Sequence, residues 1–476
     1  MHENFIGGRW VGGATHRDNI NPSDLSDVVG QYAQADATQT AEAIAAARDA
    51  AHTWAHTTGQ RKFDALDAIG SEILARKEEL ATLLAREEGK TLADARGEVD
   101  RAAGIFKFFA GEAVRVPGQL LPANRAGIVP EITREPVGVV GIIAPWNFPI
   151  AIPAWKIAPA LAYGNAVVFK PADLVPGSAW ALAEIISRAG LPEGTFNLVM
   201  GRGSVVGQAM LQDRRVDAIS FTGSVGTGRR VAEAAIGRLA KVQMEMGGKN
   251  PLVILDDADL DVAVECAVNG AYFQTGQRCT ASSRLIVQRG IYPRFVEAVK
   301  KRLEGLKIGH ALQAGTDIGP VVDAEQLAQN ERYVQIGKEE GAVLAYGGDR
   351  VKADTEGFFM RPALFVDCDN AQRICREEIF GPVAAVIPVA TYEEALEVAN
   401  DTEFGLSSGI CTTSLKHAAH FKRESQAGMV MINCPTAGVD YHAPFGGRKG
   451  SSYGPREQGQ YALEFYTTVK TTYAAA

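Results

Sequence analysis

The segment with the clearest chemical potential spans residues 276–284 and contains Cys279 among small, polar and basic residues. A thiol becomes a good nucleophile when it ionises, and neighbouring positive charge favours the thiolate. Arg278 supplies such a charge, and Gly276 allows the backbone to approach a substrate closely. The segment therefore predicts a nucleophilic cysteine, with an ordinary buried cysteine as the alternative.

A second chemical candidate is Glu245, which stands between two methionines and precedes two glycines and Lys249. Apolar neighbours desolvate a carboxylate and raise its pKa toward the range of a general base. The alternative is a structural glutamate at the end of a helix or strand, paired with Lys249.

Short apolar or β-branched runs alternate with helical patterns through residues 136–255. The runs lie at 137–143, 165–169, 195–199, 216–221 and 251–255. This alternation predicts βαβ units and a mostly parallel, doubly wound sheet. Ligands bind beyond the carboxyl ends of the strands in such sheets, so the residues that follow each run are candidates for binding.

Polar residues follow the first two of these runs. Asn147 lies between two prolines that fix the turn, so its amide is presented rigidly. Such an amide can donate to a developing oxyanion, or it can cap the next helix. Lys170 and Asp173 follow the second run, where they could bind a ribose or a phosphate, or form a surface ion pair.

Two further turns carry candidate binding residues. Gly223 and Ser224 open a glycine-rich turn into a predicted helix at 226–236, whose free N–H groups would suit a pyrophosphate, although the turn is not a GxGxxG fingerprint. Glu378 and Phe380 lie just before a predicted strand at 383–388. Paired carboxylates are unusual in a buried turn, whereas Phe380 could serve core packing alone.

Composition limits the function classes. A chain of 476 residues should divide into two or three domains, and a net charge of −8 argues against a nucleic-acid partner. The six cysteines form no CxxC pair, so neither a disulfide framework nor a metal site is expected, and a cytoplasmic location is the default. The first ten residues do not resemble a signal peptide, and the apolar run at 137–146 is too short to span a membrane.

Taken in order along the chain, seven motifs resemble those of the aldehyde dehydrogenase superfamily, nearly end to end: Asn147, Lys170, Gly223-Ser224, Glu245, Cys279, Glu378-Ile379-Phe380 and Pro444-Phe445-Gly446-Gly447. The resemblance implies an α/β fold with a doubly wound parallel-sheet cofactor domain, a second α/β catalytic domain and a small β oligomerisation arm. It assigns 1–117 and 137–247 to the dinucleotide-binding domain, 248–448 to the catalytic domain, and 118–136 with 449–476 to the oligomerisation segment. A homodimer or homotetramer is implied.

The resemblance also implies a role for each matching residue. Cys279 would attack the aldehyde carbon, and Asn147 would hold the oxyanion. After hydride transfer to NAD or NADP, Glu245 would activate the water that hydrolyses the thioester. Lys156 and Glu457 match positions that family members use as a proton relay. The residues implied to bind the cofactor are Trp146, Lys170, Asp173, Gly223, Ser224, Glu378 and Phe380.

One residue departs from the family pattern. Asp173 stands where the family often has glutamate, the carboxylate that binds the ribose hydroxyls of adenosine. A shorter side chain leaves more room for a 2′-phosphate, so the choice between NAD and NADP stays open.

Segments 221–228 and 439–459 are most similar to those of the α-ketoglutaric semialdehyde dehydrogenases. A small anionic semialdehyde requires a cation near the entrance, and the candidates are Arg278, Arg284 and Arg448, with Arg284 expected to be structural. Tyr441 and Phe445 complete the predicted substrate residues. The alternatives are a dehydrogenase of succinic semialdehyde or of aromatic aldehydes, and a cofactor-independent thiol hydrolase that uses Cys279.

Overall fold

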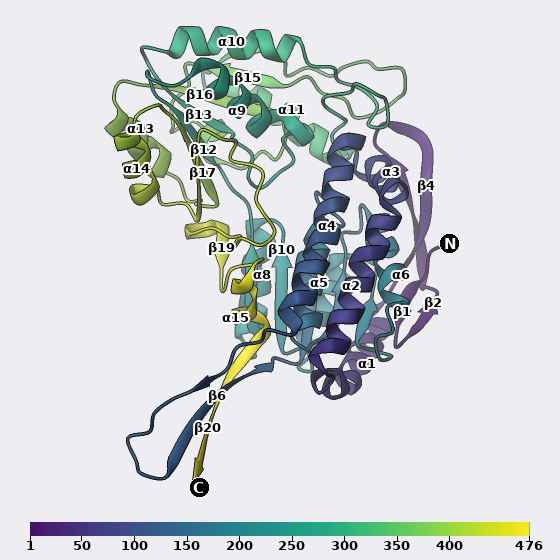
Figure 1. Ribbon diagram of the computed structural model, residues 1–476. Helices are drawn as coiled ribbons and strands as arrows, with labels where there is room; N and C mark the ends of the chain where they lie inside the picture. The colour runs from purple at the N-terminus through teal and green to yellow at the C-terminus, as the bar shows by residue number, and fades with distance from the viewer. Residues whose placement is uncertain (476) are drawn as a thin grey trace.

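The computed structural model describes residues 1–475. It contains two large sheets, each flanked by helices, and a β arm that projects from them (Figure 1). In this view the sheet formed by the later part of the chain lies above the sheet formed by the earlier part. The arm extends downward and carries the C-terminus. A two-stranded ribbon is formed by β3 (Thr15–Asn21) and β4 (Asp24–Gln34).

The first large sheet has the order β19-β11-β10-β7-β8-β9-β1-β2. Its strands are β19 (Ser452–Tyr453), β11 (Lys241–Glu245), β10 (Ala218–Thr222), β7 (Val139–Ile143), β8 (Ala166–Lys170), β9 (Phe196–Leu198), β1 (Asn4–Ile6) and β2 (Arg9–Val11). The middle five are parallel, and the outer strands are antiparallel to their neighbours. From β7 the chain winds outward through β8 and β9, then returns to build β10 and β11 on the other side. The topological switch point, where such sheets bind ligands, therefore lies between β7 and β10.

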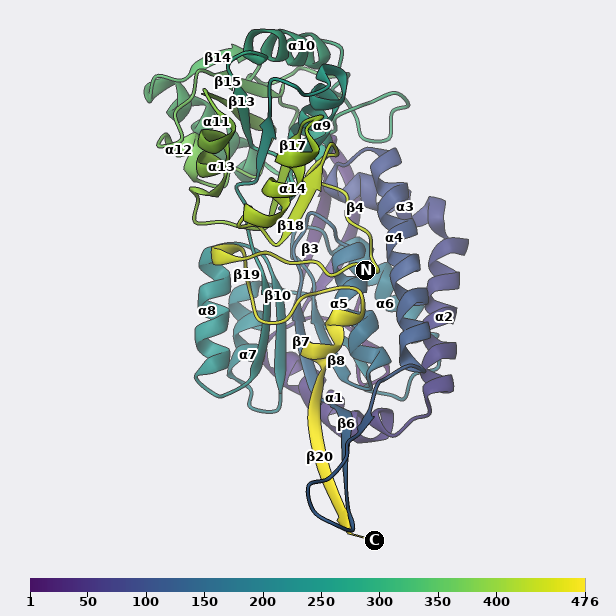
Figure 2. The same ribbon diagram turned by 60° about the vertical axis from the view of Figure 1, so that its left-hand side comes forward.

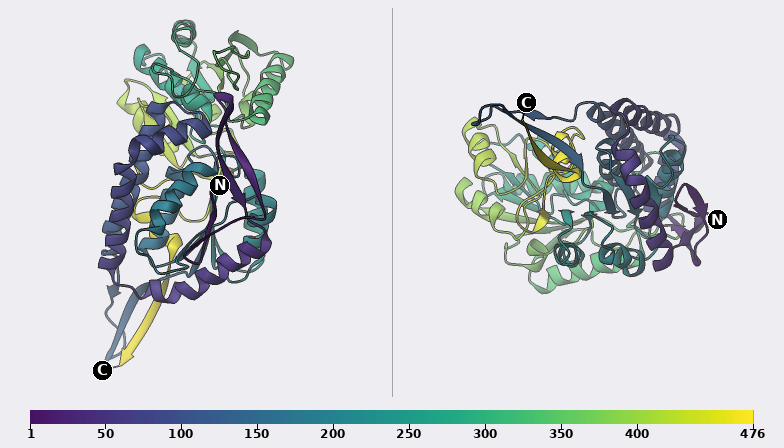
Figure 3. Two further views of the ribbon diagram at one scale, coloured as in Figure 1. Left: turned by 90° about the vertical axis from the view of Figure 1, so that its right-hand side faces the viewer. Right: turned by 90° about the horizontal axis from the view of Figure 1, so that it is seen from below.

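Helices cover both faces of this sheet (Figure 3). One face carries α1 (Ala37–Ala55), α7 (Gln208–Gln212) and α8 (Val225–Ile236), with the π-helical turn η1 (Gly203–Gly207) before α7. The other carries α2 (Gly59–Ala75), α3 (Lys77–Glu88), α4 (Leu92–Ala113), α5 (Ala151–Ala162) and α6 (Pro176–Ser187). Helix α5 is buried along its whole length because it lies between the sheet and α4, which explains why it is apolar all round except for Lys156.

The second large sheet has the order β14-β15-β16-β13-β12-β17-β18. Its strands are β14 (Val343–Tyr346), β15 (Ala363–Val366), β16 (Val383–Val389), β13 (Arg284–Gln288), β12 (Pro251–Ile254), β17 (Ser407–Cys411) and β18 (Met429–Ile432). All but β14 run parallel. The helices α9 (Leu260–Tyr272) and α10 (Tyr292–Glu304) cover one face, and α11 (Ala324–Glu339), α12 (Arg373–Arg376), α13 (Tyr392–Asn400) and α14 (Leu415–Glu424) cover the other.

The arm brings together two segments that are far apart in the sequence (Figure 2). Strand β20 (Thr467–Ala475) pairs antiparallel along the whole of β6 (Ile128–Pro136), which also pairs with β5 (Gln119–Leu120). Strands from 118–136 and 449–476, the two segments that the resemblance assigns to the oligomerisation arm, thus pair with each other within one chain. Before β20 the chain forms the helical turns η4 (Gln460–Ala462) and α15 (Leu463–Tyr466).

The predicted α/β class with a doubly wound parallel sheet is confirmed. Each predicted run at 137–143, 165–169, 195–199, 216–221 and 251–255 contains a strand of one of the two sheets. The domain boundaries stay a prediction. Within residues 1–475 the structure contains no helix with the length and apolar character needed to cross a membrane.

Candidate active site

A strained loop presents Cys279. After α9 the chain passes through the 3-10 turn η2 (Phe273–Gly276), in which Gln274 and Thr275 have positive φ values of 53° and 58°. This conformation costs of order 1–3 kcal/mol per residue and persists only where surrounding contacts impose it. One such contact is the hydroxyl of Thr275, which donates to the carbonyl of Gly319 at 3.1 Å. The loop is therefore held in place by the residues around it.

Asn250 fixes the backbone on the other side of the nucleophile. Its Nδ2 donates to the carbonyl oxygens of Cys279 at 2.7 Å and of Ala281 at 2.9 Å. Sequence reasoning missed this residue, although it follows the Gly-Gly-Lys segment that drew attention to Glu245. Asn250 and the turn η2 together restrict the backbone of Cys279.

The thiol of Cys279 is protonated at neutral pH in this structure. Burial raises its pKa to about 12, and the negative charges of Glu378 and Glu245 act in the same direction. The backbone N–H groups of Cys279 and Thr280 offset this only in part. Forming the thiolate therefore requires a change in the electrostatics beside the sulfur.

Two cavities meet at Cys279, which lines both of them. The larger, of about 390 Å³, is called here the cofactor-side cavity, and its lining includes Trp146, Asn147, Thr222, Gly223, Ser224, Glu378 and Phe380. The smaller, of about 260 Å³, is called the aldehyde-side cavity, and its lining includes Asp94, Glu98, Arg101, Phe148, Trp155, Arg278 and Phe445. A group bound in one cavity can thus reach the sulfur from one side while a second group reaches it from the other.

The cofactor-side cavity opens at the switch point of the first sheet. Trp146 and Asn147 follow β7, and Gly223 and Ser224 follow β10, which is the neighbouring strand. The Ser224 side chain caps α8, accepting the N–H of Thr227 at 3.4 Å. The helix N-terminus therefore borders the cavity, where its dipole favours an anionic group.

Glu378 and Phe380 close this cavity from the second sheet. Phe380 has a strained φ of 61° and meets the Trp146 ring edge-on, with 5.3 Å between centroids. Glu378 accepts the N–H of Gly248 at 2.9 Å, and burial raises its pKa to about 7. A Cβ on Gly247 would lie 2.1 Å from a Glu378 oxygen, so only glycine there permits this placement.

Lys170 and Asp173 do not line the cofactor-side cavity. Lys170 is buried, its Nζ donates to the carbonyl of Pro171 at 2.7 Å, and burial lowers its pKa to about 8. Asp173 forms an ion pair with Arg17 of β3, while its other oxygen is buried without a partner among residues 1–475. The ion-pair alternative for Asp173 is therefore present in the structure.

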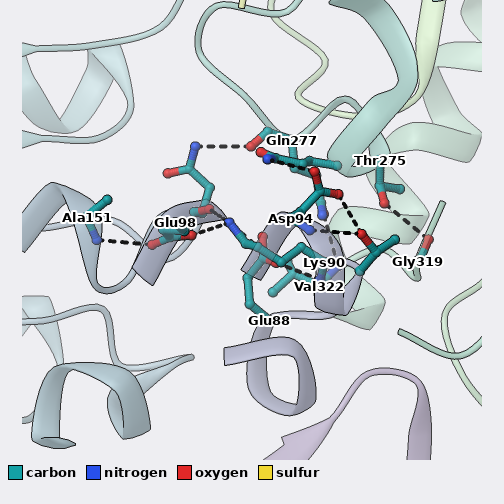
Figure 4. A network of polar contacts seen from close by, with 12 residues as sticks. Glu88, Lys90, Asp94, Glu98, Ala151, Thr275, Gln277, Gly319 and Val322 are labelled. Carbon is teal, nitrogen blue, oxygen red and sulfur yellow. Dashed lines mark hydrogen bonds and ion pairs between the residues drawn. The ribbon is translucent and has the colours of Figure 1, made fainter. Parts of the chain in front are cut away.

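A buried polar network that includes Lys90 and Glu98 (Figure 4) supports Asn147 through hydrogen bonds. The Asn147 Nδ2 donates to the carbonyl of Gln277 at 3.0 Å, and its own carbonyl accepts from Lys90 Nζ at 2.7 Å. Lys90 also donates to Glu98 at 2.6 Å, and Glu98 accepts two N–H groups at the start of α5. Asn147 provides no cap for α5, contrary to the alternative interpretation. Sequence reasoning missed Lys90 and Glu98, because no spacing rule links them to Asn147.

Glu245 ends β11 and is buried, but it lines neither cavity. Its Oε2 accepts from the hydroxyl of Ser452 at 2.6 Å. The alternative, a pairing of Glu245 with Lys249, is absent, since Lys249 Nζ is buried without a hydrogen-bond partner in the described chain. Burial and the charge of Glu457 raise the pKa of Glu245 well above its usual value, as the flanking methionines predicted.

Lys156 and Glu457 form a buried ion pair behind Glu245. Lys156 Nζ also donates to the Ser220 hydroxyl at 2.8 Å, and that hydroxyl donates to Gln243 Oε1 at 2.8 Å. Gln243 Nε2 lies 3.5 Å from a Glu245 oxygen. Burial raises the pKa of Glu457 and lowers that of Lys156. A continuous chain of polar groups thus runs from the buried pair to Glu245.

The predicted substrate residues separate into two groups. Arg278 and Phe445 line the aldehyde-side cavity, and Phe445 stacks on Trp155 with 5.4 Å between ring centroids. Tyr441 does not line it, because its ring packs beside Phe108 of α4 at 6.2 Å.

The other two candidate arginines, Arg284 and Arg448, lie outside the aldehyde-side cavity. Arg284 is fully buried and donates to backbone carbonyls, including that of Lys249 at 3.0 Å, as expected for a structural residue. Arg448 is exposed and outside the cavity. The aldehyde-side cavity contains instead Arg101 of α4, which sequence reasoning missed.

Comparison with known proteins identifies the family. The aldehyde dehydrogenase family pattern matches residues 10–472. The chain is 43% identical over 475 residues to the alpha-ketoglutaric semialdehyde dehydrogenase of Bacillus subtilis (strain 168), covering 99% of this chain and 97% of that protein. It is 41% identical over 478 residues to the alpha-ketoglutarate semialdehyde dehydrogenase of Haloferax volcanii, covering 99% and 98%. The crystal structure of betaine aldehyde dehydrogenase from Staphylococcus aureus in complex with NAD⁺ matches with a TM-score of 0.97 at 36% identity, covering 100% of this chain and 95% of that chain. The chain belongs to the aldehyde dehydrogenase family.

Proposed function

We propose that this protein oxidises α-ketoglutaric semialdehyde to α-ketoglutarate with a nicotinamide dinucleotide as hydride acceptor. The observation that carries the proposal is the position of Cys279 on the shared wall of two cavities. One cavity lies at the switch point of a doubly wound sheet, and the other is lined by two arginines, Arg101 and Arg278. The two semialdehyde dehydrogenases named above support the choice of substrate through their similarity over almost the whole chain.

The cofactor-side cavity fits a dinucleotide. It is bordered by the N-terminus of α8, and the buried hydroxyl of Thr222 on its wall has no partner among residues 1–475. Bound NAD would supply the hydride acceptor and, through its cationic nicotinamide, a positive charge beside the sulfur. Trp146, Glu378 and Phe380 would hold and orient the reactive ring end.

Arg17 bears on the choice between the two nicotinamide cofactors. Its ion pair with Asp173 places a guanidinium beside the carboxylate that the family resemblance assigns to the adenosine ribose. NAD is the cofactor in the matched betaine aldehyde dehydrogenase complex. We therefore assign NAD as the cofactor and expect a 2′-phosphate to be tolerated, because Arg17 could accept it.

Cys279 would act as the nucleophile on the aldehyde carbon, and Asn147 Nδ2 would donate to the oxyanion that forms. In the structure this amide already points toward the loop, through its hydrogen bond to the carbonyl of Gln277. The network of Lys90 and Glu98 holds the Asn147 backbone in register with the sulfur. Hydride loss from the resulting thiohemiacetal leaves an acyl thioester on Cys279.

Glu245 would activate the water that hydrolyses this thioester. Its raised pKa suits a general base. The charges of Glu457 and Lys156 would tune that pKa, while Gln243 orients the Glu245 carboxylate by donating to it. Because the Glu245 carboxylate faces Ser452, this step requires its side chain to rotate toward the sulfur. The rotation would follow acylation, when the base is first needed.

The charge of the aldehyde-side cavity favours an anionic substrate over the cationic substrate named for the betaine aldehyde dehydrogenase. Two arginines line this cavity, and Glu98, one of the two carboxylates there, is paired with Lys90. A small semialdehyde with a carboxylate at its far end suits this lining. Cationic and uncharged aldehydes are expected to be poorer substrates.

We further propose a cytoplasmic homodimer or homotetramer assembled through the β20–β6–β5 arm. The six cysteines are free, as in a reducing compartment. The arm exposes large apolar side chains, including those of Leu120, Val129, Val469 and Tyr473. Such a projecting apolar strand pair is expected to be covered by a second copy.

Steady-state assays with α-ketoglutaric semialdehyde, succinic semialdehyde, benzaldehyde and betaine aldehyde, each with NAD and NADP, test the proposal. Reduced nicotinamide should form fastest with α-ketoglutaric semialdehyde, and Cys279→Ala should abolish its formation. Undiminished turnover in Cys279→Ala would overturn the mechanism. Ester hydrolysis at full rate without any dinucleotide, together with no aldehyde oxidation, would support the thiol hydrolase instead.

A further inference from the structure

We propose that Arg101 is the residue that recognises the carboxylate of the substrate and so determines the preference for an anionic aldehyde. This inference rests on the proposed function and names the group responsible for its substrate class. Arg101 lies on α4 and shares the wall of the aldehyde-side cavity with Cys279. A bound semialdehyde could therefore present its aldehyde carbon to the sulfur and its carboxylate to this guanidinium.

The guanidinium of Arg101 has hydrogen-bonding capacity that the protein does not use. Its Nη2 donates to the amide oxygen of Gln458 at 3.0 Å, whereas its buried Nε has no partner among residues 1–475. Arg101 forms no ion pair within residues 1–475, and the carboxylates of Glu98 and Asp440 act on it only at longer range. A largely buried cation without an anion costs free energy, which a ligand carboxylate would offset.

The surroundings of Arg101 hold it in a defined position. Its guanidinium lies over the Trp155 ring at 5.6 Å from the centroid, and Trp155 in turn stacks on Phe445. Gln458 is fully buried and has a positive φ of 60°, a strained conformation for a residue other than glycine. The strain is maintained at the residue that orients the Arg101 guanidinium, as expected where the position of that group matters.

Arg278, the other arginine on the cavity wall, donates hydrogen bonds to the protein backbone. Its Nη2 donates to the carbonyl oxygens of Asn269 and Gly270, in the last turn of α9. The negative end of a helix dipole thus compensates its charge. Arg101 has no such backbone partner, and its charge is therefore the one that remains for a ligand.

The two carboxylates on the cavity wall do not compensate Arg101 either. Glu98 is paired with Lys90 and accepts N–H groups at the start of α5. Asp94 accepts from the hydroxyl of Thr91 at 2.8 Å and receives a longer contact from Gln274 at 3.4 Å. Both are committed to local hydrogen bonds, so Arg101 can form a bidentate pair with an incoming carboxylate.

The ratio of kcat/KM for α-ketoglutaric semialdehyde to that for pentanal, an uncharged aldehyde of the same chain length, tests this inference. The ratio does not depend on the fraction of folded enzyme, since both substrates are measured on one preparation. Arg101→Gln should lower the ratio by about 10- to 100-fold, the loss of a charge-assisted hydrogen bond, mainly through KM for the semialdehyde. The ratio for Arg101→Lys should lie between those of the wild type and Arg101→Gln. Lysine keeps the positive charge but lacks the planar guanidinium that can bind both carboxylate oxygens. Arg96→Gln, which removes an exposed arginine on the same helix, should leave the ratio unchanged.

A second measurement does not depend on turnover. Glutarate should protect Cys279 of the wild type from alkylation by iodoacetamide, followed by mass spectrometry of the peptide that contains Cys279. The glutarate concentration needed for protection should rise in Arg101→Gln by about the same factor as the kcat/KM ratio falls. An unchanged ratio together with unchanged protection would overturn the role of Arg101, even where the wild type prefers the semialdehyde. A wild type that shows no preference over pentanal would instead overturn the proposed substrate class.

Discussion

Two buried lysine–glutamate pairs flank the active site, and they differ in the charges and backbone donors that surround them. The Lys90–Glu98 side chains are 0% and 1% exposed, and those of Lys156–Glu457 are 0% and 3% exposed. The residue types and the burial are thus the same. One pair lies behind Asn147, and the other lies behind Glu245.

The Lys90 pair is fully satisfied. Lys90 donates to Glu98 and to the carbonyl of Asn147, and Glu88 lies 3.9 Å away. Burial alone would lower the pKa of Lys90, but the charges of Glu88 and Glu98 outweigh it and raise the pKa. The lysine therefore stays charged, and the network is fixed.

The Lys156 pair has a single carboxylate beside the lysine, and one oxygen of that carboxylate is unpaired in the described chain. Burial lowers the pKa of Lys156 in spite of its partner, and burial raises the pKa of Glu457, whose Oε2 has no hydrogen bond within residues 1–475. Both shifts favour the neutral forms, so the proton moves between these partners more readily than in the Lys90 pair, where the lysine pKa is raised. Equal burial thus yields a fixed support in one pair and a movable proton in the other. The second carboxylate beside Lys90 and the two backbone N–H groups that Glu98 accepts make the difference, because the Lys156 pair has neither among the described residues.

The largest expected effect comes from breaking the fixed pair. Lys90→Met should lower the free energy of unfolding by about 3–5 kcal/mol, because it leaves Glu98 buried and unpaired. Urea unfolding measures this loss, and kcat should fall as well because Asn147 loses its support. Lys77→Met is the matched control, since it removes an exposed pair with Asp100 and should cost no more than about 1 kcal/mol. Equal losses in the two variants would show that the Lys90 network is not a support.

Breaking the movable pair should affect chemistry more than stability. Glu457→Gln keeps the shape and an acceptor for Lys156 but cannot carry the proton. Steady-state turnover should fall by about 10- to 100-fold, while the first, rapid burst of reduced nicotinamide is kept, because only thioester hydrolysis is slowed. Stopped-flow absorbance separates the two phases. A burst lost in parallel with turnover would place Glu457 in the first half of the reaction instead.

The comparison also explains which parts of the site the sequence could predict. Trp146, Asn147, Gly223 and Ser224 follow strands that the hydrophobic runs revealed, and parallel strands bring their carboxyl ends to one edge. Their meeting therefore follows from local pattern and topology. Glu245 likewise lies at the end of a strand, although the strand β11 itself was not predicted.

Residues on helices gave no comparable signal. Lys90 precedes α4, Glu98 and Arg101 lie on it, and in the sequence they resemble a solvated helix face. Only the packing of α4 against α5 turns them toward the site. The fixed pair and the proposed substrate anchor were missed for this one reason, whereas Lys156 was found only through the family resemblance.

The strained backbone could not be predicted either. Thr275 and Phe380 have positive φ values, which sequence propensity disfavours for a β-branched or bulky residue. These conformations are imposed by contacts between distant segments, such as that between Thr275 and Gly319. The position of Tyr441 was not predictable for a similar reason, because its sequence neighbours do not reveal that its ring packs on α4.

The smallest expected effect concerns the coupling of the movable pair to Glu245. The hydroxyl of Ser452 lowers the pKa of Glu245, whereas the charge of Glu457 raises it. The basic form of a carboxylate is lost as the pH falls through its pKa, so kcat should decline on the acid side. Ser452→Ala should move that decline to higher pH by less than about one unit, the worth of a single hydrogen bond. Glu457→Gln should move it to lower pH.

The pH profile of kcat for the two variants and the wild type measures both shifts. Opposite shifts are expected only if both neighbours act on the pKa of Glu245. Ser452→Ala removes a hydrogen-bond donor, whereas Glu457→Gln removes a negative charge. Shifts in the same direction would mean that the acid limb belongs to another group. Lys90→Met, assayed beside them, should leave the position of the limb unchanged, because its pair is not connected to Glu245 by hydrogen bonds.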